Sequence, residues 1–169
     1  MVPSVTELDI LVDRWVNISL ALGMRFKNIL ILPLLVASLQ AASVSDLTFT
    51  LINGDTEYSV SDCLTTASGS LEIPSTYNGL PVTSIGYQAF IFCNFLTSIT
   101  IPDSVTSIGD GAFLYCNSLN SITIPDSVTS IGDSAFAHCT SLTNIRFDGV
   151  APTIGSQVFS YTQVSYMIL

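Results

Sequence analysis

The stretch "SITIPDSVTSIGDGAFLYCNSLN" (residues 98–120) is followed at once by "SITIPDSVTSIGDSAFAHCTSLT" (residues 121–143). The two copies differ at only a few positions, so the chain has an internal period of 23 residues. A strict period that keeps apolar residues in the same columns is typical of a solenoid, in which each repeat buries its apolar face against its neighbours. The duplication therefore predicts a solenoid, because one copy alone cannot cover its own Leu, Ile and Phe side chains.

Alignment at this period gives apolar columns that extend beyond the two copies. An Ile column is followed directly by a Gly column at residues 86, 109, 132 and 155, and further columns hold Phe, Cys and Leu. The predicted structural core comprises Ile85, Phe90, Cys93, Leu96, Ile99, Ile101, Ile108, Phe113, Cys116, Leu119, Ile122, Ile124, Ile131, Phe136, Cys139, Leu142, Ile154 and Phe159.

Each repeat is predicted to contain two extended segments and a short turn. The segment "LTSITIP" (residues 96–102) alternates as a strand does, with Ile99 and Ile101 pointing inward, and Pro102 ends it because proline cannot donate to a ladder. A second extended segment, "SVTSIG", follows. The pieces "DGAF" and "DSAF" then predict single helical turns, with Asp110 and Asp133 as N-caps.

The chain is predicted to have one folded domain with a capped solenoid. "LTFTLINGDTEYSV" (residues 47–60) reads as a β-hairpin around Asn53-Gly54, so residues 43–72 are expected to form an N-terminal β cap. Residues 73–169 then hold about four repeats, of which the last is degenerate. The predicted fold class is therefore a β-rich solenoid with short helical turns and a β-hairpin cap.

The repeat motif resembles the BspA-type leucine-rich repeat of bacterial surface proteins. The pattern Leu-x-x-Ile-x-Ile-Pro-x-x-Val-x-x-Ile-Gly-x-x-Ala-Phe-x-x-Cys-x-x-Leu runs almost intact from residue 96 to residue 142, and the resemblance covers about residues 71–160. It implies a leucine-rich-repeat solenoid that is secreted or lies at the cell surface. It also implies a role in binding or adhesion, as in family members that act as adhesins. Four repeats make a short array for this family.

The segment "MRFKNILILPLLVASLQAAS" (residues 24–43) has the pattern of a secretory signal peptide. Arg25 and Lys27 precede an apolar stretch of eleven residues, 29–39, and small residues follow it. We therefore predict a signal peptide at residues 24–42, with cleavage after Ala41 or Ala42. Residues 1–23 are interpreted as an untranslated or disordered leader. The rival interpretation, a signal anchor, would place both basic residues inside the membrane.

The charge of the chain argues against nucleic acid as a partner. The chain has four Lys and Arg residues against 13 Asp and Glu residues, which gives a net charge of −9. Recognition of phosphates needs clustered basic residues, and only Arg146 lies beyond residue 27.

The residues able to do chemistry do not form a catalytic pattern. The Cys column lacks the close pair of a zinc site and is interpreted as buried core, and Cys63 has no obvious partner. His138 is the one histidine, in a column with Phe92 and Tyr115 that suggests a surface-lining ring position. Two Asp columns, at residues 103 and 126 and at residues 110 and 133, raise the possibilities of a carboxylate pair or a calcium site. They lack a pocket and a ligand-dense loop. We expect no enzyme, no metal and no cofactor.

The outward positions of the predicted strands form the candidate partner-binding face. It comprises Ser98, Thr100, Ser121, Thr123, Asn144 and Arg146. Such a face favours recognition of a protein or glycan on another cell or matrix, although a solvated face without a ligand has the same pattern. The alternative function is a structural capping or assembly unit, which pairs through its C-terminal edge with another copy or another surface protein.

Overall fold

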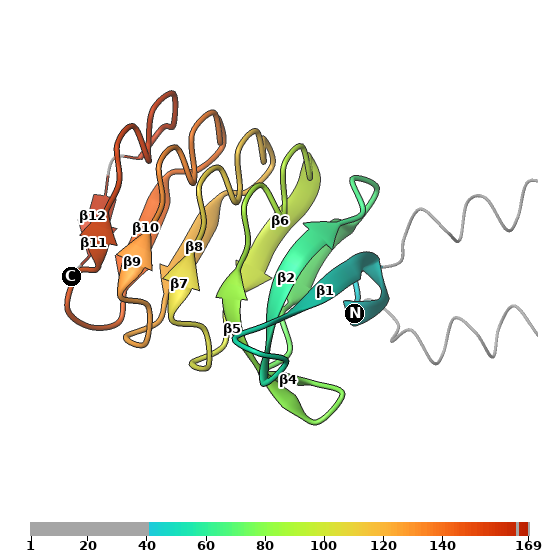
Figure 1. The fold of residues 1–169 in the computed structure, drawn as a ribbon. Helices are drawn as coiled ribbons and strands as arrows, with labels where there is room; N and C mark the ends of the chain where they lie inside the picture. Colours follow the sequence, from blue (N-terminus) through green and yellow to red (C-terminus); the bar gives the residue numbers. More distant parts are fainter. Residues whose placement is uncertain (1–40, 165, 169) are drawn as a thin grey trace, which may run out of the picture. The chain divides into compact units, whose positions relative to one another are not determined.

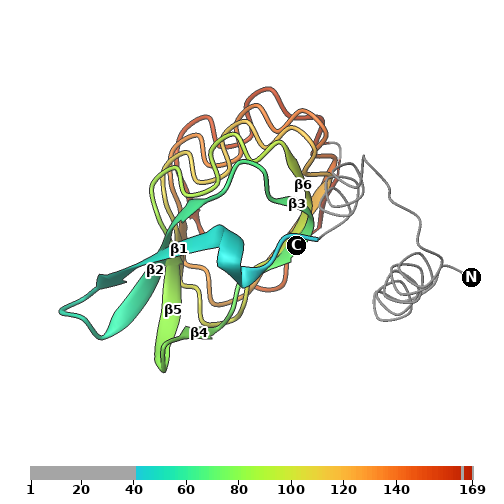
Figure 2. The ribbon, with the colours of Figure 1, turned by 90° about the vertical axis from the view of Figure 1, so that its right-hand side faces the viewer.

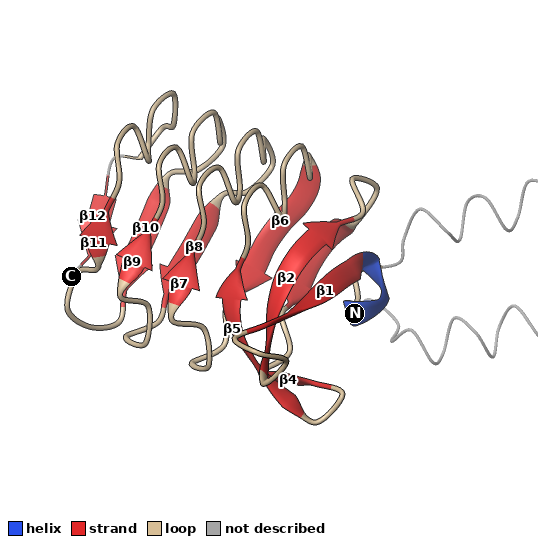
Figure 3. Cartoon of the chain, in the orientation of Figure 1, coloured by secondary structure: helices blue, strands red, loops and turns tan. Residues whose placement is uncertain are grey.

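The computed structural model describes residues 41–164 and 166–168 of the chain (Figure 1). The predicted segments 1–23 and 24–42 lie outside the described residues, except for Ala41 and Ala42. The described chain winds into a β-solenoid in which parallel strands stack layer on layer, so the predicted β-rich solenoid is confirmed (Figure 3).

The cap begins with a short 3-10 helix and a hairpin. The helix η2 (Val44–Asp46) leads into β1 (Leu47–Ile52), which pairs antiparallel with β2 (Glu57–Cys63). The hairpin turn contains Asn53 and Gly54, both with positive φ. Strand β3 (Ser68–Glu72) completes the cap layer, and β4 (Thr76–Tyr77) forms a small side hairpin with the next strand.

Four solenoid layers follow the cap, and each contributes two strands. The first layer holds β5 (Leu80–Ile85) and β6 (Phe95–Thr100), and the second holds β7 (Ser107–Ile108) and β8 (Ser121–Ile124). The third holds β9 (Ser130–Ile131) and β10 (Asn144–Phe147), and the fourth holds β11 (Thr153–Ile154) and β12 (Tyr166–Ile168).

The strands form two sheets on opposite sides of the solenoid (Figure 2). Sheet A has the order β1-β2-β5-β7-β9-β11, with β4 beside β5. Sheet B has the order β12-β10-β8-β6-β3. Because the pairing register follows the 23-residue period, Ser98 lies beside Ser121 and Ser121 beside Asn144. Each sequence column thus becomes a ladder of side chains along the solenoid.

The core is filled by the columns that the period identified. The Phe column stacks with ring centroids 4.9 Å apart for Phe90 and Phe113, and 5.0 Å apart for Phe113 and Phe136. The following predicted core residues are buried: Ile85, Phe90, Cys93, Leu96, Ile99, Ile101, Ile108, Phe113, Cys116, Leu119, Ile122, Ile124, Ile131, Phe136, Cys139 and Leu142.

The last layer departs from that pattern. Ile154 was expected in the core but is 41% exposed, and Phe159 is only partly buried. Both belong to the fourth layer, beyond which no described repeat packs. An apolar side chain in a solenoid is covered by the layers on both of its sides, and these two residues have a described neighbour on one side only.

The prediction of helical turns with Asp caps is wrong. Within the described residues the segments "DGAF" and "DSAF" form chains of β-turns, as in the bond from the N–H of Leu114 to the carbonyl of Gly111 (2.9 Å). Asp110 accepts a hydrogen bond from the backbone N–H of Asp133 (2.8 Å), and Asp133 accepts one from Ser156 (2.6 Å). Each carboxylate therefore caps the following layer instead of its own turn.

Candidate functional site

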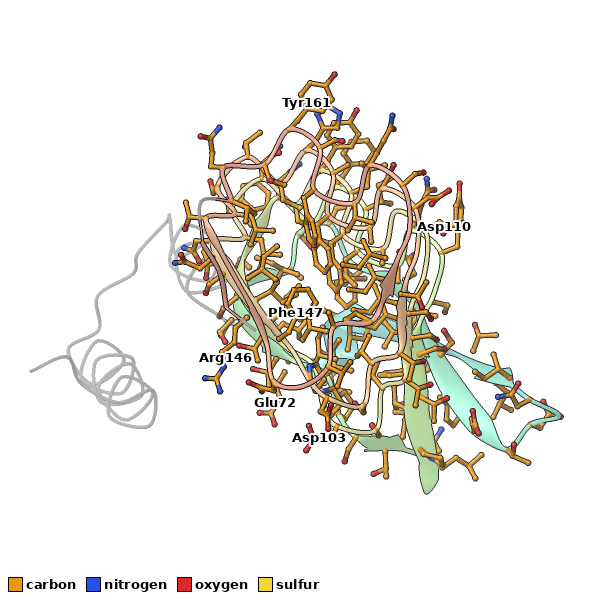
Figure 4. The ribbon with its side chains drawn as sticks, turned by 90° about the vertical axis from the view of Figure 1, so that its left-hand side faces the viewer. Glu72, Asp103, Asp110, Arg146, Phe147 and Tyr161 are labelled. Atoms are coloured by element: carbon orange, nitrogen blue, oxygen red, sulfur yellow. The ribbon has the colours of Figure 1, made fainter. Side chains whose placement is uncertain are left out.

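Sheet B positions the predicted binding residues on one outward face. On β10, Ile145 and Phe147 are buried and alternate with Asn144 and Arg146, which are exposed. The same alternation on β8 exposes Ser121 and Thr123, whereas on β6 Thr100 is exposed and Ser98 is half-buried. In Figure 4 Phe147 points between the sheets, whereas Arg146 points outward. The pleat thus separates a packed side from a polar side.

The register joins the six predicted residues into two adjacent ladders. One contains Ser98, Ser121 and Asn144, and in the other Thr123 pairs with Arg146. Thr100 pairs with Glu72 of β3 and lies one period before Thr123. All six residues therefore share one continuous surface of three parallel strands.

Strand β3 extends this face by residues that sequence reasoning missed. Ser70 pairs with Ser98, Glu72 pairs with Thr100, and both added residues are exposed. The signal was hidden because β3 lies outside the 23-residue period, so alignment of repeats does not reach it. The second ladder consequently has an acidic group on β3 and a basic group on β10, and Ile168 of β12 lies in register beside that basic residue.

Arg146 forms an ion pair on this face. Its Nε lies 2.7 Å from Oδ1 of Asp148, and the two side chains are 63% and 38% exposed. Ion pairs that are this open to solvent contribute about 0–1 kcal/mol to stability. Arg146 therefore keeps donors available for a partner at little cost to the fold.

A separate ladder of hydroxyl residues, which the sequence analysis did not predict, runs along sheet A. Ser84, Ser107, Ser130 and Thr153 lie in register on β5, β7, β9 and β11. The repeated "SVTSIG" segment was the available signal, but its outward positions were not assigned. The first two residues are half-buried and the last two are exposed.

Aromatic rings line the ridge formed by the turns. Phe92, Tyr115, His138 and Tyr161 stack with centroid distances of 5.0, 4.6 and 4.3 Å. All four have left-handed backbones, with φ between 59° and 63°. The rings of Phe92 and Tyr161 are 48% and 73% exposed. The predicted ring column is therefore a surface stack that also includes Tyr161, seen at the top of Figure 4, with Tyr115 and His138 half-buried between the two exposed rings.

The four Cys residues form buried contacts in the core. The thiol of Cys116 donates to the carbonyl of Phe90 (3.1 Å), and that of Cys139 donates to the carbonyl of Phe113 (3.0 Å). Interaction with the neighbouring thiol of Cys139, together with burial, raises the pKa of Cys116 well above its usual range. All four cysteines are free and buried. These contacts are those of packed core residues.

The Asp columns lie at exposed positions of the described chain. Asp103, Asp110, Asp126 and Asp133 are exposed, and the carboxylates of Asp110 and Asp133 accept the backbone bonds given above. Among residues 41–164 and 166–168, no cluster of three or more His, Cys, Asp or Glu side chains could hold a metal ion. In the same part of the chain, no helix has the length and apolarity needed to cross a membrane.

Comparison with known proteins identifies the repeats. A family model described as the BspA type leucine-rich repeat region matches residues 62–169 in six copies. The chain belongs to this family. Because the match starts at Asp62 within β2, it includes the end of the cap hairpin as well as the four layers that follow. No curated protein sequence matches the chain.

Solved bacterial structures support the same assignment. A leucine-rich repeat protein from Bacteroides capillosus is 31% identical with a TM-score of 0.64, over 74% of this chain and 94% of that chain. One from Bacteroides ovatus is 30% identical with a TM-score of 0.58, over 73% of this chain and 40% of that chain. A leucine-rich cell surface protein from Faecalibacterium prausnitzii is 30% identical with a TM-score of 0.55, over 72% of this chain and 34% of that chain. This BspA-type chain is consistent with a repeat module for binding.

Proposed function

We propose that the chain is an exported, non-catalytic binding module that recognises a protein or glycan through the outward face of sheet B. The observation that carries this proposal is the in-register display of Ser98, Thr100, Ser121, Thr123, Asn144 and Arg146 on three adjacent parallel strands. The cell-surface description of the Faecalibacterium relative supports an extracellular location.

The chemistry of this face suits a polar partner. Hydroxyl and amide groups both donate and accept hydrogen bonds, so they can match sugar hydroxyls or a peptide backbone. Charge on these two ladders comes from Glu72 on β3 and from Arg146 on β10, which is paired with Asp148. Recognition is therefore expected to depend on hydrogen bonds more than on salt-sensitive attraction.

The test is binding of the purified chain to an array of matrix proteins and glycans at low and high salt. The Thr123→Lys/Arg146→Glu double variant changes the centre and the charged end of the face. Ser130→Lys is the matched control, because Ser130 is an exposed hydroxyl residue on sheet A. Binding that survives salt, is lost in the double variant and persists in the control supports the proposal. Equal binding by all three proteins would place recognition elsewhere.

A second function, assembly through the C-terminal edge, is favoured by the exposed apolar residues of the last layer. Val150 is 87% exposed, Ile154 is 41% exposed and Tyr161 is 73% exposed. Strand β11 is also the outermost strand of sheet A, and outer strands present backbone groups for pairing. Light scattering over a range of concentrations tests this alternative. Growth of particle size that is lost on deletion of residues 164–169 or in Ile154→Lys would favour assembly over partner binding.

A further inference from the structure

Cys63 joins the Cys column although the 23-residue period does not place it there. It precedes Cys93 by 30 residues, whereas Cys93, Cys116 and Cys139 are each 23 residues apart. The extra residues lie in the β4 hairpin and its connections, outside the regular layers. As a result, the end of β2 in the cap comes to lie beside the Cys of the first repeat.

The sulfur atoms of Cys63 and Cys93 converge on one carbonyl group. The Sγ of Cys63 lies 3.7 Å from the carbonyl oxygen of Leu64, and the Sγ of Cys93 lies 3.8 Å from the same oxygen. Cys93 Sγ also lies 3.8 Å from the carbonyl oxygen of Cys63. The side chains are 4% and 0% exposed, so both thiols lie in one buried space between the cap and the first layer.

The other two thiols are held differently. Cys116 and Cys139 each donate to a carbonyl of the preceding layer over 3.1 and 3.0 Å. The contacts of Cys63 and Cys93 with the Leu64 carbonyl oxygen are longer, at 3.7 and 3.8 Å. These two thiols therefore form weaker hydrogen bonds to the backbone than Cys116 and Cys139 do. Regular in-register neighbours such as Cys116 and Cys139 also have parallel side chains, which fit disulfide geometry poorly. The cap pair is free of that constraint because its two segments differ in conformation.

We propose that Cys63 and Cys93 form a disulfide that joins the cap to the first repeat when the chain folds in an oxidising environment. The proposal goes beyond the binding function and does not depend on it. Each thiol loses one proton and one electron, and a small-molecule disulfide such as glutathione disulfide takes up both protons and both electrons to give two glutathione thiols, one released in each exchange step. The thiolate of one Cys attacks the oxidant to form a mixed disulfide, and the second Cys then displaces the remaining thiol.

The closeness of the two thiols also affects their protonation. Interaction with Cys63 lowers the pKa of Cys93, whereas interaction with Cys93, together with burial, raises the pKa of Cys63.

Peptide mapping of the purified chain tests the proposal. The chain is equilibrated with glutathione and glutathione disulfide, denatured, alkylated and digested. Trypsin cannot separate the four Cys residues, because no Lys or Arg lies between residues 27 and 146. Chymotrypsin cleaves after the aromatic residues, such as Tyr77 and Phe90, that lie between the two Cys. The expected product is a cross-linked pair of peptides holding Cys63 and Cys93, with Cys116 and Cys139 alkylated.

Thermal unfolding gives a second readout. Closing a loop of about 30 residues is expected to raise Tm by roughly 10 °C over the reduced chain. The Cys63→Ser/Cys93→Ser variant should lose this redox dependence, whereas Cys116→Ala should keep it. Four alkylated thiols after oxidation, or a bond between Cys116 and Cys139 in place of the expected one, would overturn the proposal. The mapping uses the unaltered chain, so it stands even if a variant fails to fold.

Discussion

Substitution of Gly132 by Ala is predicted to destabilise the solenoid strongly. A Cβ atom at this position would lie 2.5 Å from the backbone N of Asp110 and 2.7 Å from the backbone C of Gly109, and it would overlap the Asp110 carboxylate. The backbone cannot withdraw easily, because the N–H of Gly132 donates to the carbonyl of Ile108 over 2.8 Å. The Gly column therefore exists because successive layers touch through their main chains at this corner.

The expected loss follows from three contributions. Forcing a methyl group into a packed backbone contact costs about 1–3 kcal/mol. Displacement of the Asp110 carboxylate also loses its bond to the N–H of Asp133, which is worth about 1–2 kcal/mol at an exposed site. The lower entropy of the unfolded chain returns about 0.4–1 kcal/mol. The free energy of unfolding should therefore fall by about 1–5 kcal/mol, measured by urea unfolding followed by circular dichroism.

Gly111→Ser is the matched control in the same repeat. Gly111 has φ +58°, and the equivalent residue of the next repeat is Ser134, with φ +55°. A Cβ at Gly111 would meet first the flexible Gln88 side chain, at 3.3 Å. The expected cost is only the left-handed backbone, about 1 kcal/mol. A Gly132→Ala chain as stable as the unaltered protein, or a control that loses more, would refute the steric explanation.

Four further predictions concern the core, the charges and the chain terminus. Phe113→Ala should lower the free energy of unfolding by about 3–5 kcal/mol in urea titrations, because this ring is fully buried within the Phe stack. Thr83→Ala should raise the pKa of Glu57 in an NMR titration, since hydrogen bonds from Thr83 and Asn53 lower it. A lowered carboxyl pKa stabilises the fold above the unfolded pKa, so this contribution is lost as the pH falls through the folded value, and the variant should show less of that loss. Cys116 should resist a thiol reagent at pH 8 until urea is added, because interaction with the Cys139 thiol and burial raise its pKa. Mass spectrometry of exported chain should find Ala42 or Ser43 as its first residue, because small residues at positions 41 and 42 follow the apolar stretch of the predicted signal peptide.

The repeat pattern predicted most of the fold because a solenoid is built from local, repeated contacts. A 23-residue period fixes which residues lie beside each other in adjacent layers, so periodicity alone was enough to assign the Phe, Leu and Cys columns to the interior. The six residues of the candidate face were placed on sheet B for the same reason, since strand alternation fixes the outward side. The family followed from the same columns.

Prediction was less successful where the chain leaves the period. Glu72 and Cys63 belong to the cap, whose strands are not repeats, so alignment could not show that they extend the ladders. The predicted role of Asp110, an N-cap within its own turn, was also wrong. Its hydrogen-bond partner, Asp133, lies in the next layer, 23 residues away.

The sequence by itself determined that this protein is a solenoid of BspA-type repeats, which residues fill its core in the first three layers and which strand positions face outward. These properties depend on periodicity, which is written directly in the order of residues. Only the tertiary structure decided that the Gly column marks backbone contact between layers, that Asp110 and Asp133 bond to the following repeat, and that Cys63 meets Cys93. The physical reason is that such contacts depend on how closely the layers approach and on how the cap is oriented on the first repeat. A sequence period encodes neither of these properties.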